Sequence, residues 1–276
     1  MIQFANAKIN LGLCITRKRE DGYHDLETVF YPIPLKDVIE CKVADQMGFT
    51  LHGKQIPGNP ADNLILKAWH LLKKEFPQLP CLDIHLLKNI PTGAGLGGGS
   101  ADGAFMLRLL NEKFELNLTT ENLIEYALQL GSDCPFFILN TPCSALGRGE
   151  ILHPIHLDLS DCQCILIKPE VHVSTAWAFS NIQPGQSSNS PIQIIQQPMD
   201  TWKQHLVNDF EQPIFKAYPF MQEIKNTLYE AGALYSALSG TGSVIYGLFD
   251  READIQKITQ APVFSPHEVY CLSSMA

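Results

Sequence analysis

The chain has 276 residues, 45% hydrophobic and 18% charged, which is enough for one large domain or two modest ones with an ordinary core. Its net charge of −9 argues against a general binder of nucleic acid or acidic membranes, which depends on Lys and Arg. The first residues do not resemble a signal peptide, no apolar run reaches about 20 residues, and no Cys-x-x-Cys pair occurs. We therefore expect a cytoplasmic protein with reduced thiols and no nucleic-acid or membrane partner.

The N-terminal part of the chain predicts strands followed by a helix. Residues 8–15 alternate with period two, which predicts a strand with Lys8 and Asn10 on one face. A polar connection leads to a second predicted strand over 26–33. Apolar residues at helical spacing then predict a helix over 62–76, and 81–90 has the pattern of a strand.

Helices and strands continue in mixed order toward the C-terminus. Apolar residues at helical spacing predict a helix after residue 100 and another over 121–130. Strands are expected at 162–169 and on both sides of a glycine turn within 234–249. Residues 213–233 are helical in pattern, although Pro219 must kink or split them. Gln, Ser, Asn and Pro dominate 181–200, which predicts a mobile loop or insertion. Without a regular βαβ rhythm, this order favours an α+β fold with two lobes.

Residues 89–111 contain six glycines and then continue as an apolar helix pattern. A glycine-rich loop that enters a helix presents backbone N–H groups with the positive end of the helix dipole behind them, which favours phosphate. The spacing Gly93-x-Gly95-x-x-Gly98 is by itself weak evidence for a dinucleotide, and the Walker and protein-kinase motifs are absent. The alternative is a tight strand-to-helix turn, but such a turn needs one or two glycines.

Two further elements are candidates for chemistry, each with a structural alternative. Lys8 and Asn10 share a strand face, and alone they would most simply form a solvated strand edge. Asp133 stands between a helix stop and an apolar run, where an N-cap is the alternative. His153 and His156 have a spacing seen in some metal sites, but no ligand cluster follows, so we interpret them as structural and assign no metal ligand.

Together these pieces resemble the GHMP kinase family of small-molecule kinases. The family's phosphate motif, Pro-x-x-x-Gly-Leu-Gly-Ser/Gly-Ser-x-Ala, is matched between Pro91 and Ala101. Its N-terminal motif is matched by ANAKINLGL and its C-terminal motif by SGTGSVIYGLF, in the same order along the whole chain. The element DGYH at 21–24, with GSDCPFF and NDFE, resembles the branch of the family that acts on a cytidine diphosphate substrate.

The resemblance implies a two-lobed GHMP kinase fold of class α+β. Residues 1–155 would form an ATP-binding lobe like domain 2 of ribosomal protein S5, and 156–276 a ferredoxin-like lobe. The implied reaction moves the γ-phosphoryl group of ATP, with Mg²⁺, to a hydroxyl of the methylerythritol unit, in non-mevalonate isoprenoid biosynthesis. The enzyme would be a monomer or weak homodimer.

The resemblance also implies a catalytic pair. Asp133 would accept the proton of the attacking hydroxyl. Lys8 would lie beside it and steady the charge on the phosphoryl oxygens. In the alternative, Asp133 only orients the hydroxyl, and the proton leaves late through the transferred phosphate.

The residues implied for ATP are the phosphate loop and a pocket for adenine. They are Pro91, Gly93, Ala94, Gly95, Leu96, Gly97, Gly98, Gly99 and Ser100 for the phosphates, and Asn63, Leu64 and Lys88 around adenine. As isolated residues, those in the second group would more often be a helix cap and core residues.

The residues implied for the cytidine substrate come from several segments. They are Asn10, Tyr23, His24, Thr175, Phe179, Gly240 and Thr241. Tyr23 would stack on cytosine and His24 would pair with its edge, although a surface turn tyrosine is the alternative for Tyr23. Phe179 is assigned as the second stacking ring, with Trp177 as its rival. Ser239 to Gly242 would brace the phosphate loop.

Two other functions remain open at this point. The chain could be a different GHMP kinase, of the homoserine or mevalonate type. It could also be a catalytically silent member that serves as a binding module, although Lys8, Asp133 and all three motifs occur together.

Overall fold

A computed structural model describes residues 1–185 and 189–275 of the chain. The residues divide into two compact units, and each is assembled from separate chain segments. Unit 1 comprises 1–7, 35–92 and 97–141, whereas unit 2 comprises 8–34, 93–96 and 142–276. The chain therefore enters each unit more than once. The boundary near residue 155 stays a prediction.

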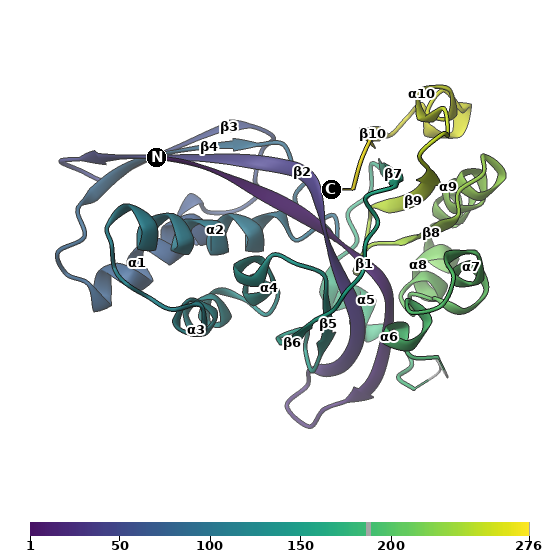
Figure 1. Ribbon diagram of the computed structural model, residues 1–276, viewed down its shortest axis with the longest axis horizontal. Coiled ribbons are helices and arrows are strands. Elements are labelled where there is room, and N and C mark those ends of the chain that lie inside the picture. Colours follow the sequence, from purple (N-terminus) through teal and green to yellow (C-terminus); the bar gives the residue numbers. More distant parts are fainter. Residues whose placement is uncertain (186–188, 276) are drawn as a thin grey trace. The chain divides into compact units, whose positions relative to one another are not determined.

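Strands and helices alternate irregularly along the chain, as expected for an α+β fold (Figure 1). The strands are β1 (Ile2–Lys18), β2 (His24–Ala44), β3 (Gly48–Gly53), β4 (Cys81–Lys88), β5 (Cys143–Leu146), β6 (Ile151–Pro154), β7 (Cys162–Lys168), β8 (Tyr235–Leu238), β9 (Ile245–Asp250) and β10 (Glu268–Leu272). The helices are α1 (Leu64–Glu75), α2 (Gly98–Lys113), α3 (Thr120–Leu130), α4 (Cys134–Leu139), α5 (Thr175–Ser180), α6 (Pro191–Ile194), α7 (Trp202–His205), α8 (Glu211–Ala217), α9 (Pro219–Glu230) and α10 (Ile255–Ile258). Both β1 and β2 extend well beyond the predicted strands.

Unit 1 contains strands covered by helices. In this unit β4 pairs antiparallel with residues 38–44 of β2 and parallel with β3. Helices α1 and α2 lie on one side of these strands (Figure 1). Helix α2 also packs against α1, α3 and α4, so nearly all of its first three turns is buried. The buried residues of α2 include one acidic side chain, Asp102.

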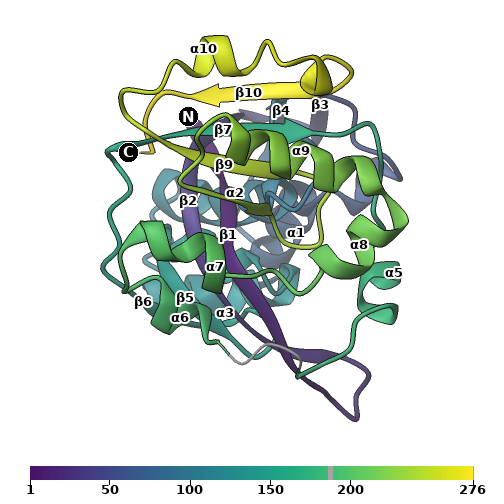
Figure 2. The ribbon, with the colours of Figure 1, turned by 90° about the vertical axis from the view of Figure 1, so that its right-hand side faces the viewer.

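Unit 2 contains a four-stranded antiparallel sheet in the order β10-β7-β9-β8. Helix α9 packs on β8 and β9, and α8 packs on α9 (Figure 2). Pro219 begins α9 and separates it from α8, so the predicted helical segment is split at this proline, which has no N–H for a helix interior. Ile165, Phe210 and Phe249 lie in the core of the unit.

Two remaining expectations concern a loop and the membrane. The predicted loop or insertion at 181–200 includes the short helix α6 and a 3-10 turn, Met199–Thr201, while its residues 186–188 lie outside the described part. Over the residues that the structure describes, no helix combines the length and the apolar character that a membrane crossing requires.

Candidate active site

The glycine-rich segment forms the connection between β4 and α2, as predicted. Gly93, Gly95 and Gly97 have φ values of 65°, 83° and 69°, a region that residues with a Cβ rarely adopt. A Cβ on Gly95 would lie only 1.9 Å from the carbonyl oxygen of Ser239. The glycines are therefore required by the backbone path itself, as well as by any ligand that approaches it.

The first half of the loop, Ala94–Leu96, is held by neutral hydrogen bonds inside unit 2. The carbonyl of Ala94 accepts from the N–H of Val244 at 3.1 Å, and that of Leu96 accepts from the N–H of Lys8 at 3.0 Å. The carbonyl of Gly95 accepts from Oγ of Ser239 at 2.8 Å. The expected contact between the C-terminal motif and the loop is thus present.

The second half of the loop, Gly97–Ser100, is the N-terminus of α2 in unit 1. Gly97 occupies the N-cap position in the left-handed conformation, so no side chain caps the helix. A Cβ added to Gly99 would have no atom from another part of the chain within 4 Å. A helix start without a capping side chain keeps N–H groups and partial positive charge for an anion. This geometry suits phosphate.

Asp133 stands at the N-cap position of α4, but its side chain makes no capping hydrogen bond. The next residue, Cys134, has a buried thiol that is hydrogen-bonded to Ser100. Burial raises the pKa of this thiol to about 12, so it stays protonated and serves packing. The contact joins the start of α4 to the start of α2, and it places Asp133 next to the phosphate loop.

Lys8 and Asn10 lie on one face of β1, as the alternation predicted. The ammonium of Lys8 donates to Oδ1 of Asn10 at 2.6 Å and lies 4.9 Å from the ring centroid of Phe30. Asn10 in turn donates to Oγ1 of Thr28 at 3.0 Å. Lys8 is only 3% exposed, so the alternative of a solvated strand edge is wrong.

The candidate cytosine residues lie together in unit 2. The ring of His24 is 5.0 Å from that of Phe179, with an interplanar angle of 30°. Burial, with a smaller effect of Lys18, lowers the pKa of His24, which favours a neutral imidazole at neutral pH. Tyr23 is 55% exposed, and the guanidinium of Arg148 lies 5.0 Å from its ring centroid.

The remaining substrate candidates meet at the glycine turn between β8 and β9. Oγ1 of Thr175 lies 3.4 Å from Oγ1 of Thr241. Gly240 has a φ of 57°, and its carbonyl accepts from the buried side chain of Asn208 at 2.8 Å. Asn208 belongs to the NDFE sequence, but nothing in the sequence pattern indicated that it would hold this turn.

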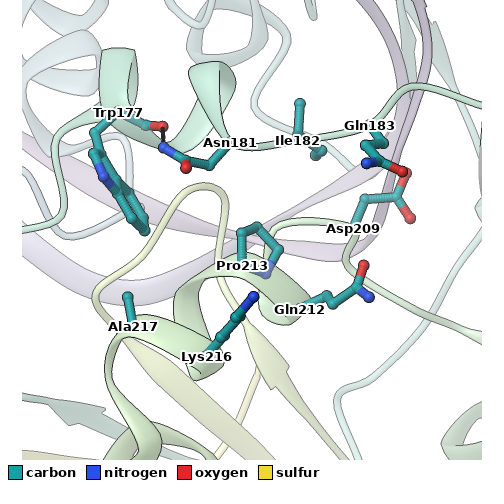
Figure 3. A pocket seen from close by; sticks show the side chains of 9 residues that line it. All are labelled: Trp177, Asn181, Ile182, Gln183, Asp209, Gln212, Pro213, Lys216 and Ala217. Atoms are coloured by element: carbon teal, nitrogen blue, oxygen red, sulfur yellow. Dashed lines mark hydrogen bonds between the residues drawn. The ribbon is translucent and has the colours of Figure 1, made fainter.

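A pocket of about 500 Å³ opens between α5 and α8 in unit 2 (Figure 3). Its lining residues are Trp177, Asn181, Ile182, Gln183, Asp209, Gln212, Pro213, Lys216 and Ala217. The amide of Asn181 donates to the backbone carbonyl of Trp177 at 2.8 Å. Trp177, the alternative to Phe179 for the second stacking ring, lines this pocket.

The adenine candidates occupy different environments in unit 1. Asn63 caps α1 through its Oδ1, which accepts from the N–H of Ile65 at 2.9 Å, and Leu64 begins the helix. Lys88 is buried, and its ammonium pairs with Asp37 and with Asp102. Sequence reasoning missed both carboxylates, although an aspartate inside the apolar pattern of α2 was a usable signal.

The pair His153 and His156 lies on the surface, at and just beyond β6. Among the described residues, no group of three or more His, Cys, Asp or Glu could hold a metal ion. All eight cysteines are free thiols, as expected.

Comparison with protein families gives two matches, which do not overlap. Residues 63–141 match the model "GHMP kinases N terminal domain", and 193–262 match "GHMP kinases C terminal". The first match includes the loop and Asp133.

Relatives match nearly the whole chain. A 4-diphosphocytidyl-2-C-methyl-D-erythritol kinase of Bacteroides fragilis (strain YCH46) is 55% identical over 262 residues, covering 94% of this chain and 95% of the relative. One from Porphyromonas gingivalis (strain ATCC 33277) is 43% identical over 261 residues, covering 93% and 95%.

The fold agrees with solved structures of the same group. A crystal structure of 4-(cytidine 5'-diphospho)-2C-methyl-D-erythritol kinase matches with a TM-score of 0.83 at 29% identity, covering 99% of this chain and 98% of that one. The Methanococcus jannaschii mevalonate kinase matches with a TM-score of 0.74 at 13% identity over 100% and 98%, which shows a shared fold alone. This chain therefore belongs to the GHMP kinases, a family of ATP-dependent phosphotransferases with an α+β fold.

Proposed function

We propose that this enzyme transfers the γ-phosphoryl group of ATP to a hydroxyl of the methylerythritol unit of 4-diphosphocytidyl-2-C-methyl-D-erythritol. The observation that carries the proposal is the uncapped start of α2 behind a loop with three positive-φ glycines. Relatives that share about half of this sequence carry the name of this kinase. The enzyme would act in the cytoplasm as a monomer or weak homodimer.

The loop and the two candidate catalytic residues would divide the work of phosphoryl transfer. Such a reaction needs positioning and charge neutralisation more than covalent help. The N–H groups of Gly97–Ser100 would bind the β- and γ-phosphates, and Lys8 would steady the charge on the transferred group. What supports this is that the N–H of Lys8 binds Leu96, while Cys134, next to Asp133, binds Ser100.

Asp133 would act as the base that accepts the proton of the attacking hydroxyl. Its position at the start of α4, beside Cys134, which contacts Ser100 of the phosphate loop, supports this role. Asn10, which is held by Lys8 and Thr28, would position the substrate hydroxyl. If Asp133→Asn retains activity near wild type, Asp133 only orients the hydroxyl.

Mg²⁺ would arrive bound to ATP. Mg²⁺ is usually bound by one or two carboxylates together with phosphate oxygens and water, so the phosphates would supply part of its ligands. When bound, the ion neutralises charge on the β- and γ-phosphates. Asn63 and Leu64 would contribute to the adenine pocket from the start of α1.

The cytidine end would bind through His24, Tyr23 and Phe179. A neutral His24 can donate and accept hydrogen bonds at a base edge. We assign the second stacking ring to Phe179 because its ring contacts His24, whereas Trp177 lines the pocket between α5 and α8. Thr175, Gly240 and Thr241 would contact the remainder of the substrate.

The direct test is phosphoryl transfer from γ-labelled ATP to the cytidine diphosphate compound, followed by phosphorus NMR to locate the new phosphate. We expect a phosphate ester on the methylerythritol unit. Transfer to homoserine or mevalonate without a need for cytidine would favour another GHMP kinase. If the label stays on ATP with every acceptor, the chain is a silent binding module.

A further inference from the structure

A buried cluster of three ionisable side chains lies where β4 enters the phosphate loop in unit 1. It consists of Lys88, Asp37 and Asp102, and none of the three is more than 2% exposed. Lys88 ends β4, Asp37 lies on β2, and Asp102 lies in the first turns of α2. The cluster therefore joins the two elements that flank the loop.

The cluster holds both ends of the connection in place. Oδ1 of Asp37 accepts from the N–H of Asn89 at 2.6 Å and from that of Ile90 at 2.9 Å, just before the loop. Lys88 also lies directly beneath the loop's far end, since a Cβ on Gly98 would come within 3.0 Å of its Nζ. A Cβ at this position would also come within 2.7 Å of Cγ2 of Ile90, so glycine at 98 leaves room for both side chains.

The charges of the cluster do not balance if all three groups are ionised. Two carboxylates would then face one ammonium in the interior, and a net buried charge is strongly disfavoured. A carboxyl group can avoid this by retaining its proton. One proton on the cluster would make it neutral.

The hydrogen bonds indicate which carboxyl retains the proton. Asp37 accepts three hydrogen bonds, from two backbone N–H groups and from Lys88, and such contacts favour the charged form. Asp102 accepts from Lys88 at 2.7 Å, but its Oδ1 is buried without a hydrogen-bond partner among the described residues. The neutral form therefore belongs to Asp102.

We propose that Asp102 is a neutral carboxylic acid at neutral pH, and that its ionisation weakens the binding of ATP to the loop above it. Asp102 is then a positioning residue whose charge state is part of the phosphate site. The part that concerns ATP rests on the proposed function.

The surroundings of Asp102 agree with this state. Burial and the neighbouring Asp37 raise its pKa to about 8, against an opposing effect of Lys88. Other charged side chains on the helices that pack against α2 are partly or fully exposed. They are Lys67, His70, Lys73, Lys74 and Glu75 of α1, Glu121 and Glu125 of α3, and Asp133 at the start of α4.

The first experiment is infrared spectroscopy of the ligand-free protein labelled with [4-¹³C]aspartate. We expect an isotope-shifted carboxylic-acid C=O band at pH 7 that disappears as the pH rises through about 8 and is absent in Asp102→Asn. Wild-type protein without this band at pH 7 would overturn the proposal. This readout does not depend on kinase activity, so it separates a failure of the proposal from a failure of the proposed function.

The second experiment compares the KM for ATP at pH 9 with that at pH 7. A new negative charge close to bound phosphates should raise KM about tenfold in wild type, with kcat little affected. For Asp102→Asn, the ratio of KM at pH 9 to KM at pH 7 should be near one.

The control variant is Glu112→Gln, which removes a negative charge from an exposed position on the same helix. It should retain the wild-type ratio of the two KM values. Equal ratios in wild type and Asp102→Asn would overturn the proposal. If no acceptor is phosphorylated, the Kd of an ATP analogue, measured by calorimetry at both pH values, takes the place of KM.

Discussion

The two halves of the phosphate loop are held in different ways. Ala94–Leu96 is fixed in unit 2 by hydrogen bonds between neutral groups, from Val244, Ser239 and the backbone of Lys8. Gly97–Ser100 and the residues before the loop are fixed in unit 1 around a buried ionic cluster. Neutral bonds do not titrate, whereas a buried ionic cluster does. The difference predicts that one half tolerates a change of pH and the other does not.

The largest effect is expected from the residue next to the second half of the loop. Asp133→Asn should lower kcat by about 10³-fold, because a general base contributes roughly 10² to 10⁴. Its KM for ATP should change little. Steady-state kinetics with the cytidine substrate checks this. A kcat within a few-fold of wild type would mean that proton removal does not limit the reaction.

The ionic cluster should be more sensitive to mutation than the neutral contacts. Asp37→Ala removes the acceptor for two backbone N–H groups and for Lys88. Buried donors left without a partner should lower stability by about 3–5 kcal/mol, even if Asp102 ionises and balances the charge of Lys88. Ser239→Ala removes one neutral hydrogen bond from the first half and should lower stability by about 1 kcal/mol. Urea unfolding of both variants measures the two losses of stability. Similar losses would contradict the expected difference between the two halves of the loop.

Two glycine substitutions separate the backbone requirement from the ligand requirement. Gly95→Ala places a Cβ against the carbonyl of Ser239 at positive φ, and it should destabilise the protein by at least about 2 kcal/mol. Gly99→Ala meets open space, so we expect wild-type stability and weaker ATP binding. Thermal unfolding and ATP titration check both. Equal destabilisation would show that Gly99 also has a structural role.

Substrate residues away from the loop should leave ATP binding unchanged. Phe179→Ala should raise the KM for the cytidine substrate about tenfold, since a base that stacks on an aromatic ring gains roughly 1–3 kcal/mol. Trp177→Ala is the matched control and should have a smaller effect. Initial-rate measurements with each substrate varied in turn decide between them. A larger effect at Trp177 would reverse the assignment.

The last prediction concerns stability and pH. The pKa of Asp102 is raised from 3.8 to about 8 in the folded protein. The native state therefore holds a proton that the unfolded chain releases above about pH 4, so this group's contribution to stability falls as the pH rises from about 4 to about 8 and is constant above that. Asp102→Asn should gain stability relative to wild type over that range. Melting temperatures from pH 5 to 9 test this, and a constant difference would contradict it.

Sequence patterns predicted the elements of the fold better than their limits. Alternation identified the face that carries Lys8 and Asn10, and the glycine pattern located the loop. The lengths of β1 and β2 were missed, because polar residues such as Arg17 and Lys36 interrupt the apolar pattern while the strands continue through backbone pairing.

The supporting residues of the candidate site were harder to predict. Asp37, Asp102 and Asn208 act through contacts between residues far apart in the chain, such as Lys88 with Asp37, and no local spacing encodes these. Lys88 was expected near adenine, yet its ammonium lies in the ionic cluster. We propose that it supports the loop from below.

The most direct measurement is a crystal structure of the enzyme with a non-hydrolysable ATP analogue and Mg²⁺. We predict that the β- and γ-phosphates accept hydrogen bonds from the N–H groups of Gly97–Ser100, with the side chains of Lys8 and Asp133 at the terminal phosphate. A triphosphate bound elsewhere, or a terminal phosphate beyond the reach of both side chains, would contradict the proposed mechanism.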